Sequence, residues 1–427
     1  MTFSLSRRAL IAASGLGLSL SFLGAEAQAS ADPDLSKRKM VVVLCRGGAD
    51  GLSITAPVGD SNYEALRKNV ALSPDKVLKI DETFGLHPAL TSTHALALKG
   101  QARFAPAIAS PDRSHSHFEA QDVLELGVAQ TRDASTGWLN RALGEMAKSQ
   151  KIQGLSVGSN SPLILRGKFQ TASWSPGKGV DQTDYLPTLL QDVYKNDPVL
   201  GPTFAAGLET EAMAAMAMKT LAPPKPLPVS SSSQDAGTMM NASSMSPMTG
   251  PAATANQAQG RGAARKLSMM LAKIMLEKNG PRIAVLSLDG WDTHAGQLGV
   301  VATRLSSLDA VLEGLNVGLG SEWSNTVVVV ATEFGRTARV NGTGGTDHGT
   351  GATAFVLGGG LKPGGIIGDW PTLKETALLD NRDLAPSLDI RGVFKGVLAD
   401  HMGLDRPTLE TTVFPDSAAI RPVTGLV

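Results

Sequence analysis

The sequence predicts an α/β fold in which helices flank a mostly parallel central sheet. Apolar runs such as KMVVVL (Lys39–Leu44) and TVVVVA (Thr326–Ala331) are continuous rather than alternating, which is typical of strands buried on both faces. An amphipathic helical pattern lies between two runs of this kind. The 46 glycines and 24 prolines suit the many short turns that such a fold needs.

The expected strands and helices follow in order along the chain. Lys39–Leu44 is a first strand, Ala102–Ala109 a weaker second one and Arg282–Leu288 a third. Apolar residues then recur every three or four positions, which predicts a helix with one apolar face: Leu298, Val301, Leu305, Leu308, Leu312 and Leu315. Because Thr326–Ala331 follows this helix, the unit is a βαβ crossover whose two strands should be parallel and adjacent or nearly so. A further strand covers Thr353–Leu357.

The N-terminus has the features of a twin-arginine signal peptide. Arg7 and Arg8 are followed by an uncharged stretch rich in Ala, Gly, Leu and Ser, and Ala27 and Ala29 stand where a signal peptidase reads small residues. The stretch is too short and too rich in Gly and Ser for a membrane anchor. We therefore expect the twin-arginine translocase to export the chain to the periplasm or beyond, residues 1–29 to be removed, and the product to be soluble, without stable membrane insertion.

The rest of the chain should form one domain over residues 36–427, interrupted by a flexible, low-complexity insertion at residues 222–261. This segment is rich in Pro, Ser and Met, and it cannot bury enough apolar surface to offset its ordering entropy. Its methionines could bind soft metal ions, although a flexible surface segment without a binding role is the simpler interpretation.

Composition excludes several classes of function. Acidic and basic residues balance at 39 each without a basic run, so there is no electrostatic case for nucleic-acid binding. Cys45 is the only cysteine, which excludes an internal disulfide, and its place at the end of an apolar strand favours packing over a nucleophilic role. The sequence contains no phosphate-binding or dinucleotide-binding fingerprint and no Gly-x-Ser-x-Gly elbow.

Chemically active side chains cluster at the ends of the predicted strands. In a parallel sheet, the loops that leave the carboxyl ends of the strands converge on one edge, and ligands bind there. The segments concerned are 46–51 (RGGADG), 110–117 (SPDRSHSH), 289–294 (DGWDTH), 332–336 (TEFGR) and, before the last strand, 345–349 (GTDHG). We expect most of them to gather at that edge, with several carboxylates, up to four of the seven histidines and three arginines.

This inventory suits a site for one or two divalent cations. Carboxylate and imidazole ligands together favour zinc, manganese or iron, while carboxylates alone would also accept calcium or magnesium. Crowded like charges would be costly without a cation. Single residues of these segments can also be explained without a metal. Asp50 can belong to a turn, Asp292 can cap a helix, and Ser116 has capping-box spacing with Glu119.

The same segments, in the same order, resemble the motifs of the DUF1501 family. The resemblance covers nearly the whole chain after the signal peptide, through 44–52 (LCRGGADGL), 84–90 (FGLHPAL), 110–118 (SPDRSHSHF), 137–141 (GWLNR), 291–294 (WDTH), 333–337 (EFGRT) and 346–349 (TDHG). Members of this family are typically exported, and they are grouped with the alkaline phosphatase-like superfamily of metal-dependent phosphatases, sulfatases and phosphomutases. The resemblance therefore implies an alkaline phosphatase-like sandwich.

The resemblance also implies a set of metal ligands. Asp50 takes the place of the superfamily's metal-binding Asp after the first strand. Asp292 and His294 resemble the Asp and His that follow a later strand, and Asp289 is an alternative to Asp292 for that carboxylate. Glu333 and Phe334 stand where the superfamily has an Asp-His pair, so one imidazole is missing. The implied ligands are Asp50, Asp292, His294, Glu333, Asp347 and His348.

The nucleophile departs from the superfamily pattern. Ala109 stands where sulfatases place a modified Cys or Ser, so formylglycine chemistry is not expected, and Ser114, Ser110 or a metal-bound water would attack instead. The catalytic candidates are Ser114, as the nucleophile to test first, with His115 or His117 as the proton carrier. The candidates for binding the anionic group are Arg46, Arg113 and Arg336.

The sequence thus predicts an exported, metal-dependent hydrolase that acts on a small anionic substrate, a phosphate or sulfate ester. The missing nucleophile and histidine leave an alternative, a non-catalytic periplasmic metal- or ligand-binding protein that retains the fold. A third possibility is a cell-envelope scaffold that docks partners through residues 222–261.

Overall fold

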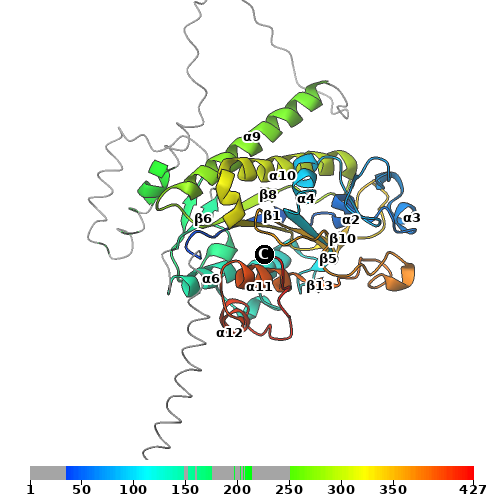
Figure 1. Ribbon diagram of the computed structural model, residues 1–427. Coiled ribbons are helices and arrows are strands. Elements are labelled where there is room, and N and C mark those ends of the chain that lie inside the picture. The colour runs from blue at the N-terminus through cyan, green and yellow to red at the C-terminus, as the bar shows by residue number, and fades with distance from the viewer. Residues whose placement is uncertain are drawn as a thin grey trace, which may run out of the picture. The chain divides into compact units, whose positions relative to one another are not determined.

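A central eight-stranded sheet organises the part of the chain that the structure, a computed structural model, describes (Figure 1). The strand order is β13-β5-β12-β9-β1-β8-β6-β7. The bounds are Lys39–Arg46 for β1, Ala102–Ala109 for β5, Gly154–Val157 for β6, Ala172–Trp174 for β7, Ile283–Asp289 for β8, Thr326–Ala331 for β9, Ala352–Gly358 for β12 and Leu388–Asp389 for β13. Every pairing in this sheet is parallel except those of β12, which runs antiparallel to β5 and β9. The predicted mostly parallel α/β fold is therefore confirmed.

The structure describes residues 35–148, 152–158, 161–175, 197, 202, 205, 207–213 and 251–427. The predicted signal peptide and residues 222–250 of the predicted insertion lie outside these ranges. Residues 251–261, which we expected to be the end of that insertion, instead belong to a helix, α9 (Pro251–Leu276). No helix in the described ranges is both long enough and apolar enough to span a bilayer.

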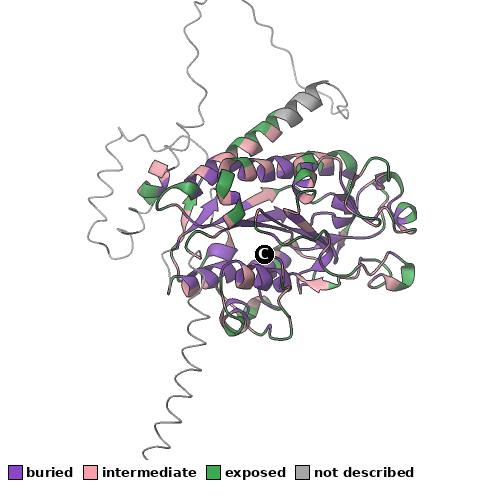
Figure 2. Cartoon of the chain, in the orientation of Figure 1, coloured by how far each residue is buried: buried purple, intermediate pink, exposed green. Residues whose placement is uncertain are grey.

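Burial on both faces of the sheet explains its continuous apolar runs. In β1, Val41 and Val43 are fully buried in one core cluster, whereas Met40, Val42 and Leu44 are buried in the cluster on the opposite face. Because successive side chains of a strand point to opposite faces, a strand covered on both sides needs apolar residues at every position. Figure 2 shows buried residues running through the strands and along the helix faces that adjoin them.

Helices cover both faces of the sheet (Figure 1). Those on one face, with α9, are α4 (Thr91–Ala97) and α10 (Gln297–Leu319), and those on the other are α5 (His117–Leu126), α6 (Trp138–Met146) and α11 (Ile390–Asp400). The helix α10 connects β8 to β9, and both strands pair in parallel with β1, which lies between them. The predicted crossover is thus confirmed, with its two strands separated by one neighbour.

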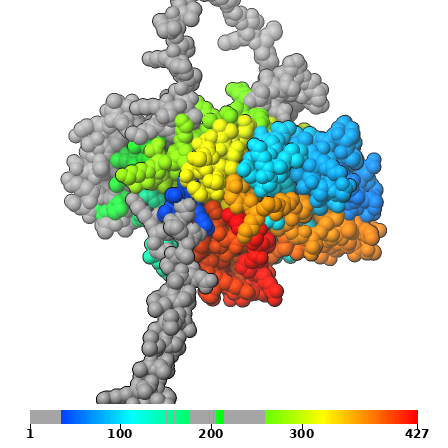
Figure 3. Space-filling view, viewed as in Figure 1, coloured from blue at the N-terminus to red at the C-terminus, as the bar shows by residue number. Residues whose placement is uncertain are grey.

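Shorter elements surround the sheet. They are the helices α2 (Gly51–Ile54), α3 (Tyr63–Arg67) and α12 (Arg406–Thr408), the strands β2 (Thr55–Ala56), β3 (Leu78–Lys79) and β4 (Gly85–Leu86), and the two-stranded ribbon of β10 (Gly335–Arg336) and β11 (His348–Gly349). In Figure 3 the orange segment lies against the blue N-terminal part of the domain, and a hydrogen bond of 3.0 Å from Trp370 Nε1 to Asp60 joins these two regions.

The direction of the strands decides where the polar segments meet. The carboxyl ends of β1, β5, β8 and β9 lie on one edge of the sheet, and β12 begins at this edge because it runs in the opposite direction. The ribbon of β10 and β11 adds to the same edge and pairs Arg336 with His348. This edge carries the candidate functional site.

Candidate metal centre

Three imidazoles converge on one carboxylate at this edge. The carboxylate belongs to Asp292, which follows β8 together with His294; His117 is the first residue of α5, and His348 lies in β11. Asp292 Oδ1 is 3.0 Å from His294 Nε2 and 3.3 Å from His348 Nε2. Asp292 Oδ2 is 3.4 Å from His117 Nε2. His117, Asp292 and His348 each offer one potential ligand atom, and these three atoms lie within 4.8 Å of one another.

Each imidazole has its other nitrogen, Nδ1, beside a hydrogen-bond acceptor. The pairs are His117 with Glu333 Oε1 (2.9 Å), His294 with Asp347 Oδ1 (3.2 Å) and His348 with the main-chain carbonyl of His115 (2.8 Å). A carbonyl or an ionised carboxylate can only accept, so Nδ1 is the donor in each pair. A neutral imidazole that donates from Nδ1 carries a lone pair on Nε2.

The three Nε2 lone pairs therefore face a carboxylate and one another. His294 Nε2 and His348 Nε2 are only 3.0 Å apart, and His117 Nε2 is buried without a hydrogen-bond partner among the described residues. Acceptors in such proximity require a positive charge between them, either a proton or a metal ion. An imidazole oriented through Nδ1 by a carboxylate or a carbonyl is the usual arrangement of a metal-binding histidine, so the residues present fit a bound cation.

The pKa values of the cluster are set by a few neighbours. The hydrogen bond with Glu333 raises the pKa of His117. Burial would raise the pKa of Asp292, but the hydrogen bond and charge of Arg336 outweigh it and hold this pKa below its ordinary value. Burial lowers the pKa of His348, and the charge of Arg336 adds to the effect. His348 is therefore neutral at neutral pH, as a metal ligand must be.

Arg336 lies behind the cluster rather than in front of it. Its guanidinium is inaccessible to solvent and forms an ion pair with Asp292. The same group donates to the main-chain carbonyls of Gly48 (2.8 Å), Gly47 (2.8 Å), Thr346 (3.0 Å) and Trp291 (3.2 Å). Arg336 thus joins the loops after β1 and β8 to the loop before β12, and it fixes Asp292.

Two glycines let the loops approach closely under the site. Gly47 has φ +119°, and a Cβ there would lie 2.5 Å from the main-chain nitrogen of Asp292. Gly48 has φ +66°, and its Cβ would lie 2.4 Å from the ring of Phe334. The ring of Phe334 in turn packs on His117 and His348, with both centroid distances at 4.8 Å. Side chains at either glycine would displace the walls of the metal centre.

Glu333 and Asp50 lie in different surroundings. Glu333 is buried and accepts from the Gly47 amide (2.8 Å) as well as from His117, so it orients a histidine from behind. Asp50 is equally buried, but it forms an ion pair with Arg67 and accepts from Ser53 Oγ (2.6 Å). The charge of Asp50 is therefore balanced by an arginine, in a buried network that also includes Ser53 and Gln297.

The loop after β5 holds Ser114 and Arg113. The Ser114 hydroxyl donates to Asp112 Oδ1 at 2.8 Å. Arg113 is exposed, and its Nη1 donates to the carbonyls of Ser110 and Asp112 at 2.7 and 2.6 Å. Of the three predicted anion-binding arginines, Arg113 is the one that lies open to solvent.

His115 acts on the cluster through its main chain. Its φ of +56° is a left-handed conformation, and in it the carbonyl accepts from His348. The imidazole of His115 is anchored by Thr350 Oγ1 at 3.2 Å and faces Asp383 Oδ2 at 3.5 Å. The neighbouring Arg382 donates to the His348 carbonyl at 2.6 Å. Neither Arg382 nor Asp383 could be predicted as part of the site from the sequence, because their irregular segment shows no motif.

Arg46 and Asp289 lie apart from the three imidazoles. Both line a cavity of about 430 Å³ on the same edge of the sheet. The Arg46 guanidinium donates to Glu125 (2.6 Å), Gln121 (2.7 Å) and Ser287 (3.3 Å). Asp289, the rival of Asp292, therefore belongs to this cavity and not to the metal centre.

Several solved structures are similar to this fold at low identity. A lipoteichoic acid synthase, LtaP, from Listeria monocytogenes has a TM-score of 0.39 and 10% identity, with 90% of this chain and 78% of that one covered. The phosphonate monoester hydrolase of Agrobacterium radiobacter has a TM-score of 0.37 and 11% identity, with coverages of 86% and 74%. An alkaline phosphatase superfamily protein from Vibrio parahaemolyticus has a TM-score of 0.31 and 10% identity, with 78% of this chain and 63% of that one covered. This chain therefore spans under two thirds of that protein's length.

No curated protein matches the sequence. The family comparison matches residues 37–413 to a family described as "Protein of unknown function (DUF1501)". This range contains the sheet, the candidate metal centre and the cavity beside it. The match confirms the resemblance of the sequence motifs, and the chain belongs to the DUF1501 family.

Proposed function

We propose that this protein is an exported, metal-dependent hydrolase of phosphate or sulfate esters. The observation that carries the proposal is the convergence of three imidazole Nε2 atoms on Asp292, with every Nδ1 beside an acceptor. Such an arrangement presents lone pairs to a cation and stays unfavourable without a positive charge.

The geometry supports a specific division of roles. His117, Asp292 and His348 hold the ion, with His294 beside them as a further ligand. Glu333, which orients His117, belongs to the supporting shell rather than to the ligands. A donor set rich in imidazole favours zinc, manganese or iron over calcium and magnesium.

The two remaining carboxylates of the predicted ligand set, Asp347 and Asp50, have other roles in this scheme. Asp347 orients His294 in the way that Glu333 orients His117. Asp50, whose carboxylate is paired with Arg67, is not required as a ligand in this scheme.

The chemistry follows from these positions. A divalent cation at such a site polarises the ester oxygen and lowers the pKa of a nucleophile. Arg113, which is exposed in the loop between β5 and His117, would pair with the anionic group. Ser114 is the nucleophile to test first, since its hydroxyl is already oriented by Asp112.

The test uses the purified mature protein. Its bound metal is measured by elemental analysis, and aryl phosphates, phosphodiesters and sulfate esters are screened with and without chelator. We expect stoichiometric metal and turnover that the chelator abolishes. Absence of metal after reconstitution with zinc, manganese and iron would refute the proposal.

A second candidate is a non-catalytic metal-binding protein with the same fold. It is favoured by the nucleophile position, where Ala109 is a buried residue of β5 with no reactive group. Tight metal binding without turnover of any ester, in both the wild type and Ser114→Ala, would establish this alternative.

Export is the remaining part of the proposal. It rests on the paired arginines and the small-residue cleavage site of the first 29 residues. Cell fractionation should find the wild type in the periplasm, while a variant with Arg7→Lys and Arg8→Lys should stay in the cytoplasm. Equal export of both would exclude the twin-arginine route.

A further inference from the structure

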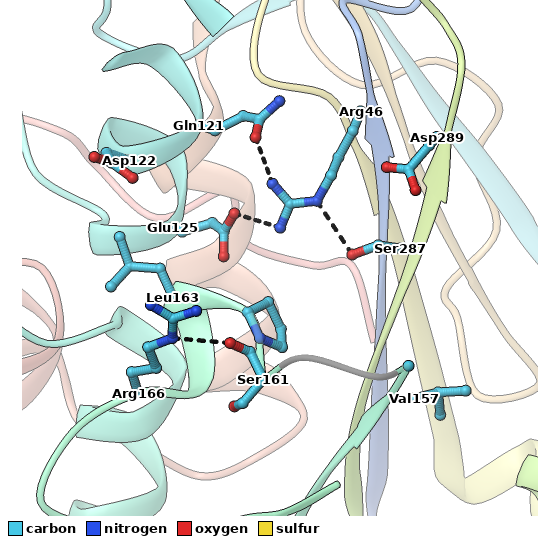
Figure 4. Close-up of a pocket in the computed structure, with 12 residues that line it drawn as sticks. Arg46, Gln121, Asp122, Glu125, Val157, Ser161, Leu163, Arg166, Ser287 and Asp289 are labelled. Atoms are coloured by element: carbon cyan, nitrogen blue, oxygen red, sulfur yellow. Dashed lines mark hydrogen bonds and ion pairs between the residues drawn. The ribbon is translucent and has the colours of Figure 1, made fainter. Parts of the chain in front are cut away.

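A cavity lies beside the candidate metal centre, and none of the roles proposed above uses it. It has a volume of about 430 Å³ and lies between the C-terminal half of α5 and the ends of β1 and β8 (Figure 4). Most of its lining is polar, including Arg46, Gln121, Asp122, Glu125 and Asp289. A pocket of this size accommodates a small organic group such as one sugar ring.

The cavity and the metal centre share one face of α5. His117, Gln121 and Glu125 are spaced four residues apart, so they lie on the same side of the helix, with about 12 Å from the first to the last. His117 belongs to the metal centre, and Glu125 lines the cavity. Gln121 connects the two, since it donates to Glu333 at 3.1 Å and accepts from Arg46 at 2.7 Å. A molecule held in the cavity would therefore extend toward the metal centre.

The charges in the cavity favour a cationic ligand over an anionic one. Arg46 is paired with Glu125 at 2.6 Å, so its charge is already balanced. Asp122 and Asp289 line the cavity, are exposed, and have no hydrogen bond or ion pair with any described side chain, as Figure 4 also shows. With Arg166 as the second arginine, the lining holds two positive charges against three carboxylates. The carboxylates outnumber the arginines by one, and of the three only Glu125 has an arginine partner, which leaves Asp122 and Asp289 as acceptors.

We propose that this cavity binds the alcohol part of the ester, and that this part is a hydroxyl-rich group carrying an amine, such as an amino sugar. Asp122 and Asp289 would accept hydrogen bonds from its hydroxyl and ammonium groups. Leu163 and Val157, which also line the cavity, offer an apolar surface to the C–H face of a ring. The claim that the bound group is part of the substrate rests on the proposed hydrolase function. The claim that the cavity binds such a group rests on the cavity alone.

The test measures binding of three probes by saturation-transfer NMR and titration, using protein that has been treated with metal and then freed of unbound ions. The probes are D-glucosamine, methyl glucoside and D-glucuronate, which share a ring but differ in charge. We expect glucosamine to bind most tightly, methyl glucoside more weakly, and glucuronate not at all. Glucuronate binding as tight as that of glucosamine would overturn the inference.

Substitutions locate the site. Asp122→Asn and Asp289→Asn should each weaken glucosamine binding about tenfold, the effect of losing one charge-assisted hydrogen bond, and should leave methyl glucoside binding less affected. Glu119→Gln is the matched control, because Glu119 is an exposed carboxylate of α5 outside the cavity lining. If both Asn variants bind glucosamine as the control does, the inference is wrong.

The same preparations separate this inference from the proposed function. Metal content and ester turnover are measured alongside binding. Metal and turnover without glucosamine binding would remove only the cavity assignment. Glucosamine binding that depends on Asp122 and Asp289, in a protein with neither metal nor turnover, would remove the hydrolase and retain the cavity as a binding site.

Discussion

Glu333→Gln is the sharpest perturbation of the metal centre, because it changes one charge and almost no volume. Glu333 Oε1 accepts from His117 Nδ1 at 2.9 Å, from the Gly47 amide at 2.8 Å and from Gln121 at 3.1 Å. Burial would raise the pKa of Glu333, but these hydrogen bonds keep it below its ordinary value, so the carboxylate is ionised. The substitution leaves an acceptor oxygen in place but removes the negative charge behind His117.

The expected size of the effect follows from that hydrogen bond. A hydrogen bond to a charged group contributes about 1 kcal/mol more than one between neutral groups, which corresponds to roughly a fivefold change in affinity. If the amide rotates and offers its NH₂ to His117, the ring changes tautomer and Nε2 loses its lone pair. The metal affinity of Glu333→Gln should therefore fall about 10- to 100-fold, the range known for supporting residues of metal sites.

The assay is a metal titration in competition with a chromophoric chelator. Glu125→Gln is the matched control, since Glu125 is an equally buried carboxylate that bonds Arg46 and the Ile164 amide, not a histidine. The control should lose stability but keep its metal affinity. A Glu333→Gln protein whose affinity stays within twofold of the wild type would refute the orienting role.

Three further predictions follow from single contacts. Gly48→Ala should destabilise the fold by about 1–3 kcal/mol and weaken metal binding, because its Cβ would strike Phe334 from a left-handed backbone; an unfolding curve like the wild type's would contradict this. Asp383→Asn should weaken metal binding several-fold through His348, and an unchanged chelator titration would count against that positioning chain. Burial lowers the pKa of His87 to about 4, from 6.5 in the unfolded chain. The unfolded state then binds more protons, so stability should fall by at most about 3 kcal/mol as pH drops from 6.5 to 4. His87→Gln should flatten this part of the pH profile measured by urea unfolding, and a profile as steep as the wild type's would show that the slope arises elsewhere.

The strands could be predicted from sequence because burial on two faces leaves a local signal. The run Thr326–Ala331 coincides with β9, and Lys39–Leu44 falls two residues short of the end of β1. The reversed direction of β12 could not be predicted, because it depends on pairing with β5 and β9, which are distant in the sequence. That reversal is what brings His348, which precedes β12, to the same edge as the residues that follow the parallel strands.

The sequence indicated which residues gather but not which of them would face a bound ion in the proposed centre. Ligand and supporting residue differ only in the partner of each imidazole, and Glu333 is 216 positions from His117. The family resemblance placed Glu333 among the implied ligands, and His117 was a candidate proton carrier because it follows Ser114 in the same loop. In the same way, no local pattern shows that Arg67 pairs with Asp50 or that Arg336 is turned inward.

The location of the bound ion tests the central claim most directly. Crystals of the reconstituted protein, measured at the absorption edge of the metal, give an anomalous peak at its position. We predict a peak at bonding distance from Nε2 of His117 and His348 and from the Asp292 carboxylate, with Glu333 still on Nδ1 of His117. A peak at Asp50 instead, or protonated imidazoles bonded to Asp292 with no ion between them, would contradict the account.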